Sequence, residues 1–245
     1  MGKVKTKNRI AGNICKNNLL FNTYFCEMKK YEDSWRHKGM RIKLAESLEE
    51  KGITDQRVLR AIRELPRHFF LDTAFAGIAY EDRAFPIGEG QTISQPYTVA
   101  YQTQLLDVQP FDKILEIGTG SAYQSCILAE LGATVYTIER QKKLYEQLKN
   151  FIFRSRYPTI KFFYGDGYEG LPTYAPFDKV IVTAAAPFIP EKLLEQLKTG
   201  GIMVIPVGGT EGQRMFRVTK TGDHAFEQEV YDNFSFVPML SGKHG

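Results

Sequence analysis

The chain has 245 residues, of which 43% are hydrophobic and 13% aromatic, the composition of an ordinary globular protein. No stretch approaches the ~20 consecutive apolar residues of a membrane-spanning helix, so we expect no membrane partner. The net charge of +4 is concentrated in residues 1–38, whose nine Lys/Arg outnumber three Asp/Glu, and the near-neutral remainder argues against a nucleic-acid partner.

Residues 1–39 carry no helical or strand periodicity, and we expect them to be a basic leader, either disordered or an upstream extension of the domain. The cysteines of the chain, Cys15, Cys26 and Cys126, lack the CxxC spacing of metal and redox motifs. This pattern indicates reduced thiols and predicts a cytoplasmic protein.

Residues 40–80 predict an N-terminal helical subdomain. Apolar residues from Ile42 to Leu48 recur at helical spacing and stop at Gly52, which is a typical helix C-cap. Thr54-Asp55 then caps a second amphipathic helix, which Pro66 ends. These helices carry no chemistry of their own, and we expect them to pack beside a main sheet.

The stretch GEGQTISQPYTVAYQ (88–102) gathers small, uncharged hydrogen-bonding side chains in one turn before a proline. Apart from Glu89 it holds no charge, and none of its side chains is a strong base or a typical metal ligand. One explanation for Ser94 is local, because Pro96 suits the first position of a helix and a serine just before it can cap that helix. The other explanation is a binding role for the Ser94 hydroxyl.

Residues 81–208 alternate short apolar strands with helices, which predicts βαβ units and a parallel sheet. Expected strands are 113–118, 134–139, 160–166, 177–185 and 200–208, and expected helices are 121–132 (with Ser121 as N-cap), 140–153 and 191–197. Residues 209–245 show no helical pattern, and Thr221-Gly222 reads as a turn between antiparallel strands. We therefore predict a single α/β domain over 40–245. It is a doubly wound, mostly parallel Rossmann-like sheet with helices on both faces, antiparallel C-terminal strands and the N-terminal helical subdomain.

Glycines and acids fall at successive strand ends of this sheet. Glu116, Gly118 and Gly120 end the first strand, Glu139 ends the second and Asp166 the third. The carboxyl ends of parallel strands meet in one crevice, where glycines admit a ligand and a carboxylate can bind ribose hydroxyls. The third glycine of a dinucleotide motif is missing, and the acids would repel phosphates. They suit a cationic ligand with a sulfonium, an ammonium and a ribose, which favours S-adenosylmethionine.

Over nearly all of residues 40–240 the chain resembles the protein-L-isoaspartate (D-aspartate) O-methyltransferases, a family of class I S-adenosylmethionine-dependent methyltransferases. The motifs that carry the resemblance are FPIGEGQTISQPYTVA (85–100), ILEIGTGSAYQ (114–124), IER (138–140), GDGYEGLP (165–172), FDKVIVTAAAPFIPEKLLEQLKTGGIMVIPVG (177–208) and FVPM (236–239). The first motif is close to a signature of this family. One departure is Ala122, where the family usually has glycine.

The resemblance implies protein repair. Family members methylate the free α-carboxylate of L-isoaspartyl (and D-aspartyl) residues in damaged proteins and peptides, and the ester returns through a succinimide to normal aspartyl. A carboxylate with a pKa of about 4 is already ionised at neutral pH, so the transfer needs alignment by neutral donors and no general base. The implied cofactor is S-adenosyl-L-methionine, with S-adenosyl-L-homocysteine as product. No feature of the sequence demands more than a monomer.

The resemblance also assigns residues to roles. Ser94 is the expected catalytic residue, as a hydrogen-bond donor to the substrate or cofactor carboxylate. The expected cofactor-binding residues are Thr92, Ser94, Glu116, Gly118, Thr119, Gly120, Ser121, Glu139, Arg140, Gly165, Asp166, Gly167 and Thr183. The expected substrate-binding residues are Gln91, Ile93, Gln95, Ala184, Ala185, Ala186, Pro187, Val237 and Pro238. We expect no metal, because the histidines His37, His68, His224 and His244 are scattered without metal-ligand spacing.

Two rival functions stay open on the sequence. A methyltransferase of RNA or of a small molecule would normally show a catalytic acid or base, or an aromatic NPPY-like clamp, where this chain has TAAA (183–186). A non-enzymatic binding module that keeps the cofactor pocket would be favoured by loss of Gly118, Glu139 or Ser94, and all three are present.

Overall fold

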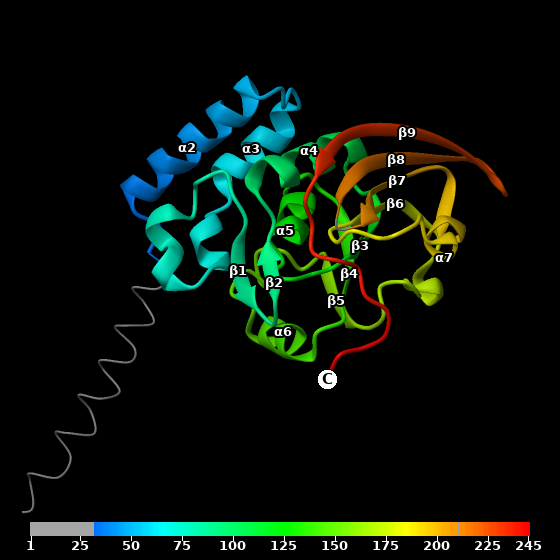
Figure 1. Cartoon of the computed structure of the whole chain (residues 1–245). Coiled ribbons are helices and arrows are strands. Elements are labelled where there is room, and N and C mark those ends of the chain that lie inside the picture. The colour runs from blue at the N-terminus through cyan, green and yellow to red at the C-terminus, as the bar shows by residue number, and fades with distance from the viewer. Residues whose placement is uncertain (1–31, 210) are drawn as a thin grey trace, which may run out of the picture.

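A seven-stranded mixed sheet forms the centre of the protein. The computed structural model describes residues 32–209 and 211–245. The sheet has the order β5-β4-β3-β6-β7-β8-β9, with parallel pairs from β5 to β7 and antiparallel pairs at β8 and β9 (Figure 1). Its strands are β3 (Lys113–Ile117), β4 (Thr134–Glu139), β5 (Ile160–Tyr164), β6 (Phe177–Val182), β7 (Leu197–Gly209), β8 (Gly212–Gly222) and β9 (Ala225–Phe234).

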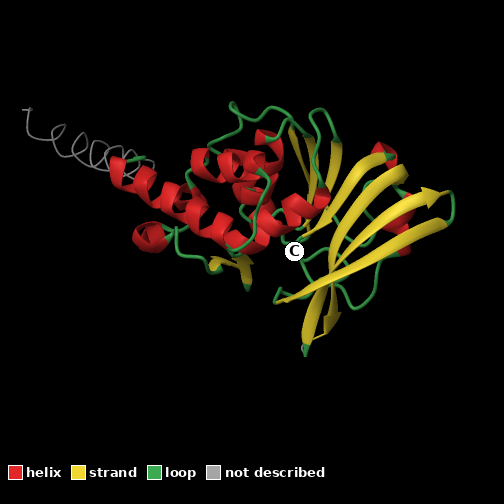
Figure 2. Cartoon of the chain, turned by 90° about the horizontal axis from the view of Figure 1, so that it is seen from above, coloured by secondary structure: helices red, strands yellow, loops and turns green. Residues whose placement is uncertain are grey.

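Each face of the sheet is covered by its own apolar core. Neighbouring residues of β3 go to opposite cores, because strand side chains alternate between faces: Ile114 joins the first core and Leu115 the second. The first core includes buried side chains of α3 (Gln56–Glu64), α4 (Pro96–Leu106) and α5 (Tyr123–Glu130). The second core includes buried side chains of α7 (Glu191–Glu195). Viewed from above, most of the helices lie to one side of the strands (Figure 2). The predicted doubly wound α/β architecture is confirmed.

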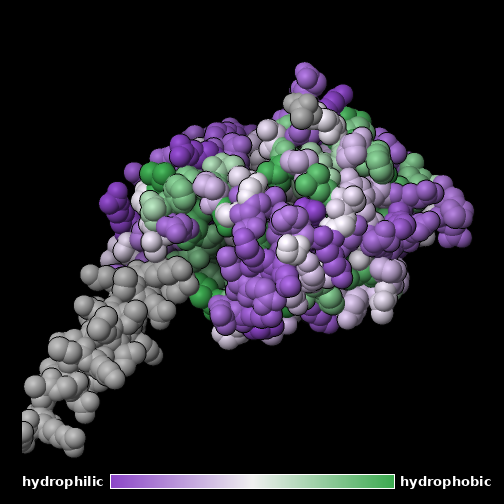
Figure 3. All heavy atoms as spheres, turned by 60° about the horizontal axis from the view of Figure 1, so that its bottom comes forward, coloured by the Kyte–Doolittle hydropathy of each residue, from purple (hydrophilic) through white to green (hydrophobic). Residues whose placement is uncertain are grey.

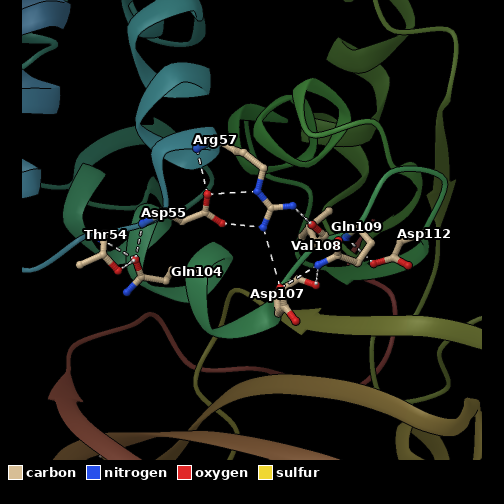
Figure 4. Close-up of polar contacts among 8 residues, drawn as sticks. All are labelled: Thr54, Asp55, Arg57, Gln104, Asp107, Val108, Gln109 and Asp112. Atoms are coloured by element: carbon tan, nitrogen blue, oxygen red, sulfur yellow. Dashed lines mark hydrogen bonds and ion pairs between the residues drawn. The ribbon is translucent and has the colours of Figure 1, made fainter.

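The N-terminal helices are joined to the sheet layer through polar contacts at the start of α3 (Figure 4). The side-chain oxygen of Gln104, on α4, accepts hydrogen bonds from the amides of Thr54 (2.7 Å) and Asp55 (2.9 Å). Arg57 donates to the carbonyl of Val108 at 2.9 Å. The amides at a helix N-terminus have no partner within the helix, and the Gln104 oxygen supplies one for the amides of Thr54 and Asp55. The helical subdomain is thereby fixed on α4.

The first helix, α2 (Trp35–Glu50), begins upstream of the expected boundary at residue 40. Ser34 is its N-cap, and the Ser34 hydroxyl accepts a hydrogen bond from the His37 amide at 3.3 Å. This capping motif lies within the segment assigned to the leader, so helical structure begins upstream of the predicted boundary at residue 40. The rest of the predicted leader, residues 1–31, lies outside the described residues.

Helix boundaries also differ from the prediction, and the expected helix 191–197 ends at Glu195. The segment 140–153 contains only α6 (Lys142–Gln147) and a single 3₁₀ turn, η3 (Leu148–Asn150). The chain leaves the helix there because Phe151 and Phe153 pack into the first core, where Phe153 stacks on Phe70 at 5.1 Å between ring centroids. Ser121 is not the N-cap of α5: Ala122 takes that position.

The structure also contains a hairpin and short 3₁₀ turns beside the sheet. The hairpin pairs β1 (Phe85–Gly88) with β2 (Gln91–Ile93), and its tip residues Glu89 and Gly90 both have positive φ. The 3₁₀ turns are η1 (Arg67–Phe70), η2 (Thr73–Ile78) and η4 (Pro172–Tyr174). Within the described residues, every helix is too short or too polar to cross a bilayer. The hairpin leads directly into α4, and so places the sequence 91–95 above the sheet's carboxyl end.

Candidate active site

Two adjoining cavities lie at the carboxyl ends of β3, β4 and β6. The strand order reverses here, because the sheet extends from β3 to β4 and β5 on one side and to β6 and β7 on the other. We call them the main cleft and the Ser94 cavity. The main cleft is lined by Gln91, Thr92, Ile117, Gly118, Gly120, Ile138, Glu139, Arg140, Gly167, Thr183, Ala184, Val237, Pro238, Met239 and Leu240. The Ser94 cavity is lined by Thr92, Ile93, Ser94, Val99, Gly118, Thr119, Gly120, Ser121, Tyr123, Gln124 and Thr183. The glycine turn and Thr183 are therefore walls of both cavities.

The glycine turn at 118–120 follows β3 and is held against the end of β6. Gly118 has a φ of 97°, and a Cβ at this position would lie 2.5 Å from the Thr183 hydroxyl oxygen. That hydroxyl can donate to the carbonyl of Ile117 (2.9 Å) or of Gly118 (2.8 Å). Only glycine fits here without displacing Thr183, so the backbone of the turn can approach a ligand closely.

Glu139 is buried at the end of β4 and holds the glycine turn from the other side. Its carboxylate accepts hydrogen bonds from the amides of Gly120 (2.9 Å) and Gln141 (2.7 Å). Burial raises the pKa of Glu139, and these amide hydrogen bonds act in the opposite direction. Each carboxylate oxygen has more than one acceptor position, so a carboxylate that lines the main cleft can still accept two hydroxyl groups of a ligand.

Ser94 connects β2 to α4 and is half-buried at the wall of the Ser94 cavity. The N-cap of α4 is Gln95, which makes no side-chain capping bond, and Pro96 is the first helical residue. The local explanation for Ser94, as the cap of this helix, is therefore wrong. Its hydroxyl makes no hydrogen bond to any residue that the structure describes, whereas its carbonyl accepts one from Arg67 at 2.8 Å. The hydroxyl is free to bind a ligand.

Several expected site residues line neither cavity. These are Gln95, Glu116, Gly165, Asp166, Ala185, Ala186 and Pro187. The TAAA segment is engaged with its own protein, because the Ala185 amide donates to Val237 (2.8 Å) and the Ala186 amide donates to Pro206 (3.0 Å). Those two amides are thus not available to a peptide substrate.

The two acids in this set have structural partners. Glu116 is fully buried beneath the turn, where one carboxylate oxygen accepts from the Ser125 hydroxyl and the other has no partner among the described residues. Desolvation raises the pKa of Glu116 to about 8, against the opposing effect of the Ser125 hydrogen bond. Asp166 accepts from the amides of Tyr168 (2.9 Å) and Gly242 (2.6 Å). Neither acid lines the main cleft or the Ser94 cavity.

The remaining expected residues are brought together as predicted, and the structure adds an apolar wall that the sequence analysis missed. Ile117 and Ile138 lie at the carboxyl ends of β3 and β4, and Met239 and Leu240 lie in the C-terminal segment. That segment is held by Arg140, whose guanidinium donates to the carbonyl of Gly242 at 3.1 Å. A strand-end signal existed for the isoleucines. For the C-terminal segment only the family resemblance gave a signal, at Val237 and Pro238, because its placement depends on contacts between residues about a hundred positions apart.

Two further features lie outside the cavities. The structure stacks His37 on His68, with 3.9 Å between ring centroids, and places Asp33 beside them, so the prediction that these histidines are scattered is wrong. Both Asp33 oxygens already accept from Arg41, at 2.6 and 3.0 Å. A wide apolar groove is lined by side chains of η1, η2 and η3, and apolar surface of this kind shows in green at the left of Figure 3.

Comparison with known proteins agrees with this geometry. The family model for protein-L-isoaspartate(D-aspartate) O-methyltransferase (PCMT) matches residues 40–244. A protein-L-isoaspartate O-methyltransferase of Cytophaga hutchinsonii is 54% identical over 87% of this chain and 96% of the relative. One of Flavobacterium johnsoniae is 51% identical over 86% of this chain and 99% of the relative.

Solved structures give the same result. A protein-L-isoaspartate O-methyltransferase is similar with a TM-score of 0.71 and 27% identity, over 81% of this chain, which spans 65% of that protein. A β-aspartate methyltransferase of Plasmodium falciparum, in complex with S-adenosyl-L-homocysteine, has a TM-score of 0.70 and 25% identity over 82% of this chain and 98% of its own. With the family model matching most of its length, this chain belongs to the protein-L-isoaspartate(D-aspartate) O-methyltransferase family.

Proposed function

We propose that the chain transfers a methyl group from S-adenosyl-L-methionine to the free α-carboxylate of L-isoaspartyl and D-aspartyl residues in damaged proteins and peptides. One observation carries the proposal: the free Ser94 hydroxyl lies in a cavity whose only titratable lining side chain is Tyr123. Burial raises the pKa of Tyr123, so this side chain stays protonated at neutral pH. The cavity therefore offers no base, and an acceptor must arrive already ionised, as a carboxylate does.

The residues of the main cleft fit S-adenosyl-L-methionine. Glu139 would accept hydrogen bonds from the ribose hydroxyls, and the apolar wall of Ile117 and Ile138 would cover the adenine ring. The glycine turn would let the backbone approach the methionine portion. When bound, this cofactor supplies an electrophilic methyl group on a sulfonium.

The chain's own residues would then orient the acceptor. The Ser94 hydroxyl donates a hydrogen bond to the substrate carboxylate and aligns one of its oxygens, without removing a proton and without forming an ion pair. Thr92, which lines both cavities, is a second neutral donor. The wall of Val237 and Pro238, together with Gln91 and Ala184, would receive the substrate main chain. Methyl transfer to a carboxylate oxygen would give an ester and S-adenosyl-L-homocysteine. Attack of the adjacent backbone amide nitrogen on the ester then expels methanol and forms a succinimide, whose hydrolysis returns some normal aspartyl without a further residue.

Further elements of the proposal concern the state in which the protein works. We assign the reaction to a metal-free monomer in the cytoplasm, acting on protein and not on nucleic acid. The buried thiol of Cys126 and the near-neutral charge of the domain support this assignment. The functional domain would be one unit from residue 35 to the end of the C-terminal wall.

The proposal is tested by labelled-methyl transfer to an isoaspartyl peptide, beside its normal aspartyl twin. We expect a base-labile methyl ester on the isoaspartyl peptide only. Ser94→Ala should lower kcat by about 10- to 1,000-fold, the scale of losing one transition-state donor, whereas Ser155→Ala, at an exposed position, should not change it. Methyl transfer to nucleic acid would support the first rival function, and binding of S-adenosyl-L-homocysteine without transfer to either peptide would support the second. Full turnover by Ser94→Ala would refute the role of that hydroxyl.

A further inference from the structure

Arg67 is a buried cation that forms no ion pair with any residue that the structure describes. It lies in η1 and its side chain is fully buried. Its Nε donates to the carbonyl of Ala79 at 3.1 Å, its Nη2 donates to the carbonyl of Ser94 at 2.8 Å, and its Nη1 has no partner among the described residues. Burying an arginine without an anion costs folding free energy, so a side chain retained here needs a reason other than stability.

Arg41 is a buried arginine with a carboxylate partner, which is the arrangement expected where an arginine only stabilises the fold. It is also buried in the helical subdomain, but both Asp33 oxygens accept from its guanidinium, at 2.6 and 3.0 Å. Its Nε donates to the carbonyl of Arg63 at 2.8 Å. Arg41 therefore joins parts of the subdomain to one another and contacts neither cavity.

The contacts of Arg67, in contrast, join the two halves of the Ser94 cavity. Through the Ser94 carbonyl it holds the turn between β2 and α4. Its guanidinium also lies over the Tyr123 ring, 4.8 Å from the centroid, and Tyr123 is the first residue of α5 after the glycine turn. Ser94 and Tyr123 both line the cavity. The rigid, planar guanidinium of Arg67 therefore connects the turn that holds Ser94 with the start of α5, just after the glycine turn.

We propose that Arg67 is a positioning residue for methyl transfer: it fixes the Ser94 backbone against α5 and thereby aims the Ser94 hydroxyl at the acceptor oxygen. The proposal rests on the function proposed above. Lysine at this position would keep the charge but lacks the planar fork that reaches two carbonyls and stacks on a ring. Displacement of a catalytic group by about 1 Å can cost on the order of 100-fold in rate.

The test compares Arg67→Lys and Arg67→Met with Arg41→Met, a substitution at a second buried arginine, as the control. For each we would measure kcat, KM for the isoaspartyl peptide and for S-adenosyl-L-methionine, and the thermal midpoint. We expect both Arg67 variants to lower kcat by about 10- to 100-fold while KM for S-adenosyl-L-methionine changes less than about threefold. Arg41→Met should lower the thermal midpoint and leave kcat unchanged at a temperature well below it.

A second readout does not depend on activity. Hydrogen exchange of the segment 91–97, followed by mass spectrometry, should increase in Arg67→Lys and stay at the wild-type level in Arg41→Met. If Arg67→Met does not fold, Arg67→Lys carries both measurements. An inactive wild-type protein would refute the proposed function while the exchange data still decide the anchoring role. Wild-type kcat together with wild-type exchange of 91–97 in Arg67→Lys would overturn the inference.

Discussion

Replacement of Gly118 by alanine probes the contact on which the glycine turn depends. The new Cβ would lie 2.5 Å from the Thr183 hydroxyl oxygen, well inside van der Waals contact. The Thr183 hydroxyl lies 2.9 Å from the carbonyl of Ile117 and 2.8 Å from that of Gly118, and it cannot keep this position once the new Cβ is present. The substitution must therefore move Thr183 or open the turn, and Thr183 lines both cavities.

The magnitude has two parts. An alanine at a φ of 97° carries the left-handed backbone penalty of about 1–2 kcal/mol. Displacement of Thr183 gives up a hydrogen bond worth about 1 kcal/mol. We expect Gly118→Ala to lower the free energy of unfolding by about 2–3 kcal/mol and to weaken S-adenosyl-L-homocysteine binding at least tenfold, which corresponds to about 1.4 kcal/mol.

Gly52→Ala is the matched control. Gly52 has nearly the same φ, 98°, but a Cβ there meets no atom within 4 Å, and the residue lies at the end of α2, away from both cavities. It should lower the free energy of unfolding by about 1–2 kcal/mol and leave binding unchanged. Urea unfolding and titration calorimetry with S-adenosyl-L-homocysteine measure the two quantities. Equal destabilisation by both variants, with wild-type affinity in each, would refute the argument from Thr183.

Two further predictions concern the pH dependence of stability. The folded-state pKa of Glu116 is raised from 4.5 to about 8, so its contribution is fully present below pH 4.5 and is lost as pH rises through 8. Glu116→Gln should remove a loss on the order of 2 kcal/mol between pH 6 and 8, measured by urea unfolding, and parallel curves for the two proteins would contradict this. Burial lowers the pKa of His68 from 6.5 to about 4, so its contribution is present above pH 6.5 and is lost as pH falls toward 4. Between pH 6.5 and 5, His68→Gln should therefore lose less of its free energy of unfolding than the wild type, by on the order of 2 kcal/mol. The same loss in both proteins would show that burial of His68 does not cause the acid sensitivity.

The sheet could be predicted from the sequence because its strands are runs of buried apolar residues. The predicted strand 134–139 coincides with β4, whereas the turn expected at Thr221-Gly222 lies two residues later, at Asp223-His224, after Gly222 ends β8. The helix ends were harder. Phe151 and Phe153 continue the helical pattern of α6 in sequence but leave the helix to reach the first core. Local periodicity cannot distinguish a helical face from side chains that a tertiary contact will take up.

Among the expected site residues, backbone geometry determines the position of those at the glycine turn and the strand ends, whereas the direction of a strand side chain could not be read from the sequence. Gly118, Gly120 and Glu139 stand at strand ends, and any parallel sheet brings such residues together. Glu116 precedes Ile117, the last residue of β3, and no residue of this strand is exposed. Because polar and apolar residues do not alternate along β3, the sequence did not show to which face the Glu116 side chain points. The structure directs Glu116 beneath the turn to Ser125, and Ile117 is the residue that reaches the main cleft.

The same geometry explains how an alanine is tolerated at 122. Its φ of 66° is a conformation that favours glycine, which agrees with the glycine usual in the family. The Ala122 methyl group is fully buried, and the burial of this apolar group offsets part of its backbone strain. The departure from the family motif therefore leaves the turn in place.

The charged groups around the cavities share one property: each is bound to the protein's own backbone. Glu139 and Asp166 accept from amides, and Arg140 and Arg67 donate to carbonyls. The charges thus fix the positions of turns, while the Ser94 hydroxyl, the neutral group that we propose as donor to the acceptor, has no hydrogen bond to any described residue. A cation in direct contact with the acceptor carboxylate would stabilise its negative charge in the ground state and weaken it as a nucleophile. A neutral donor, held in place by charges one layer behind it, aligns the carboxylate without that cost.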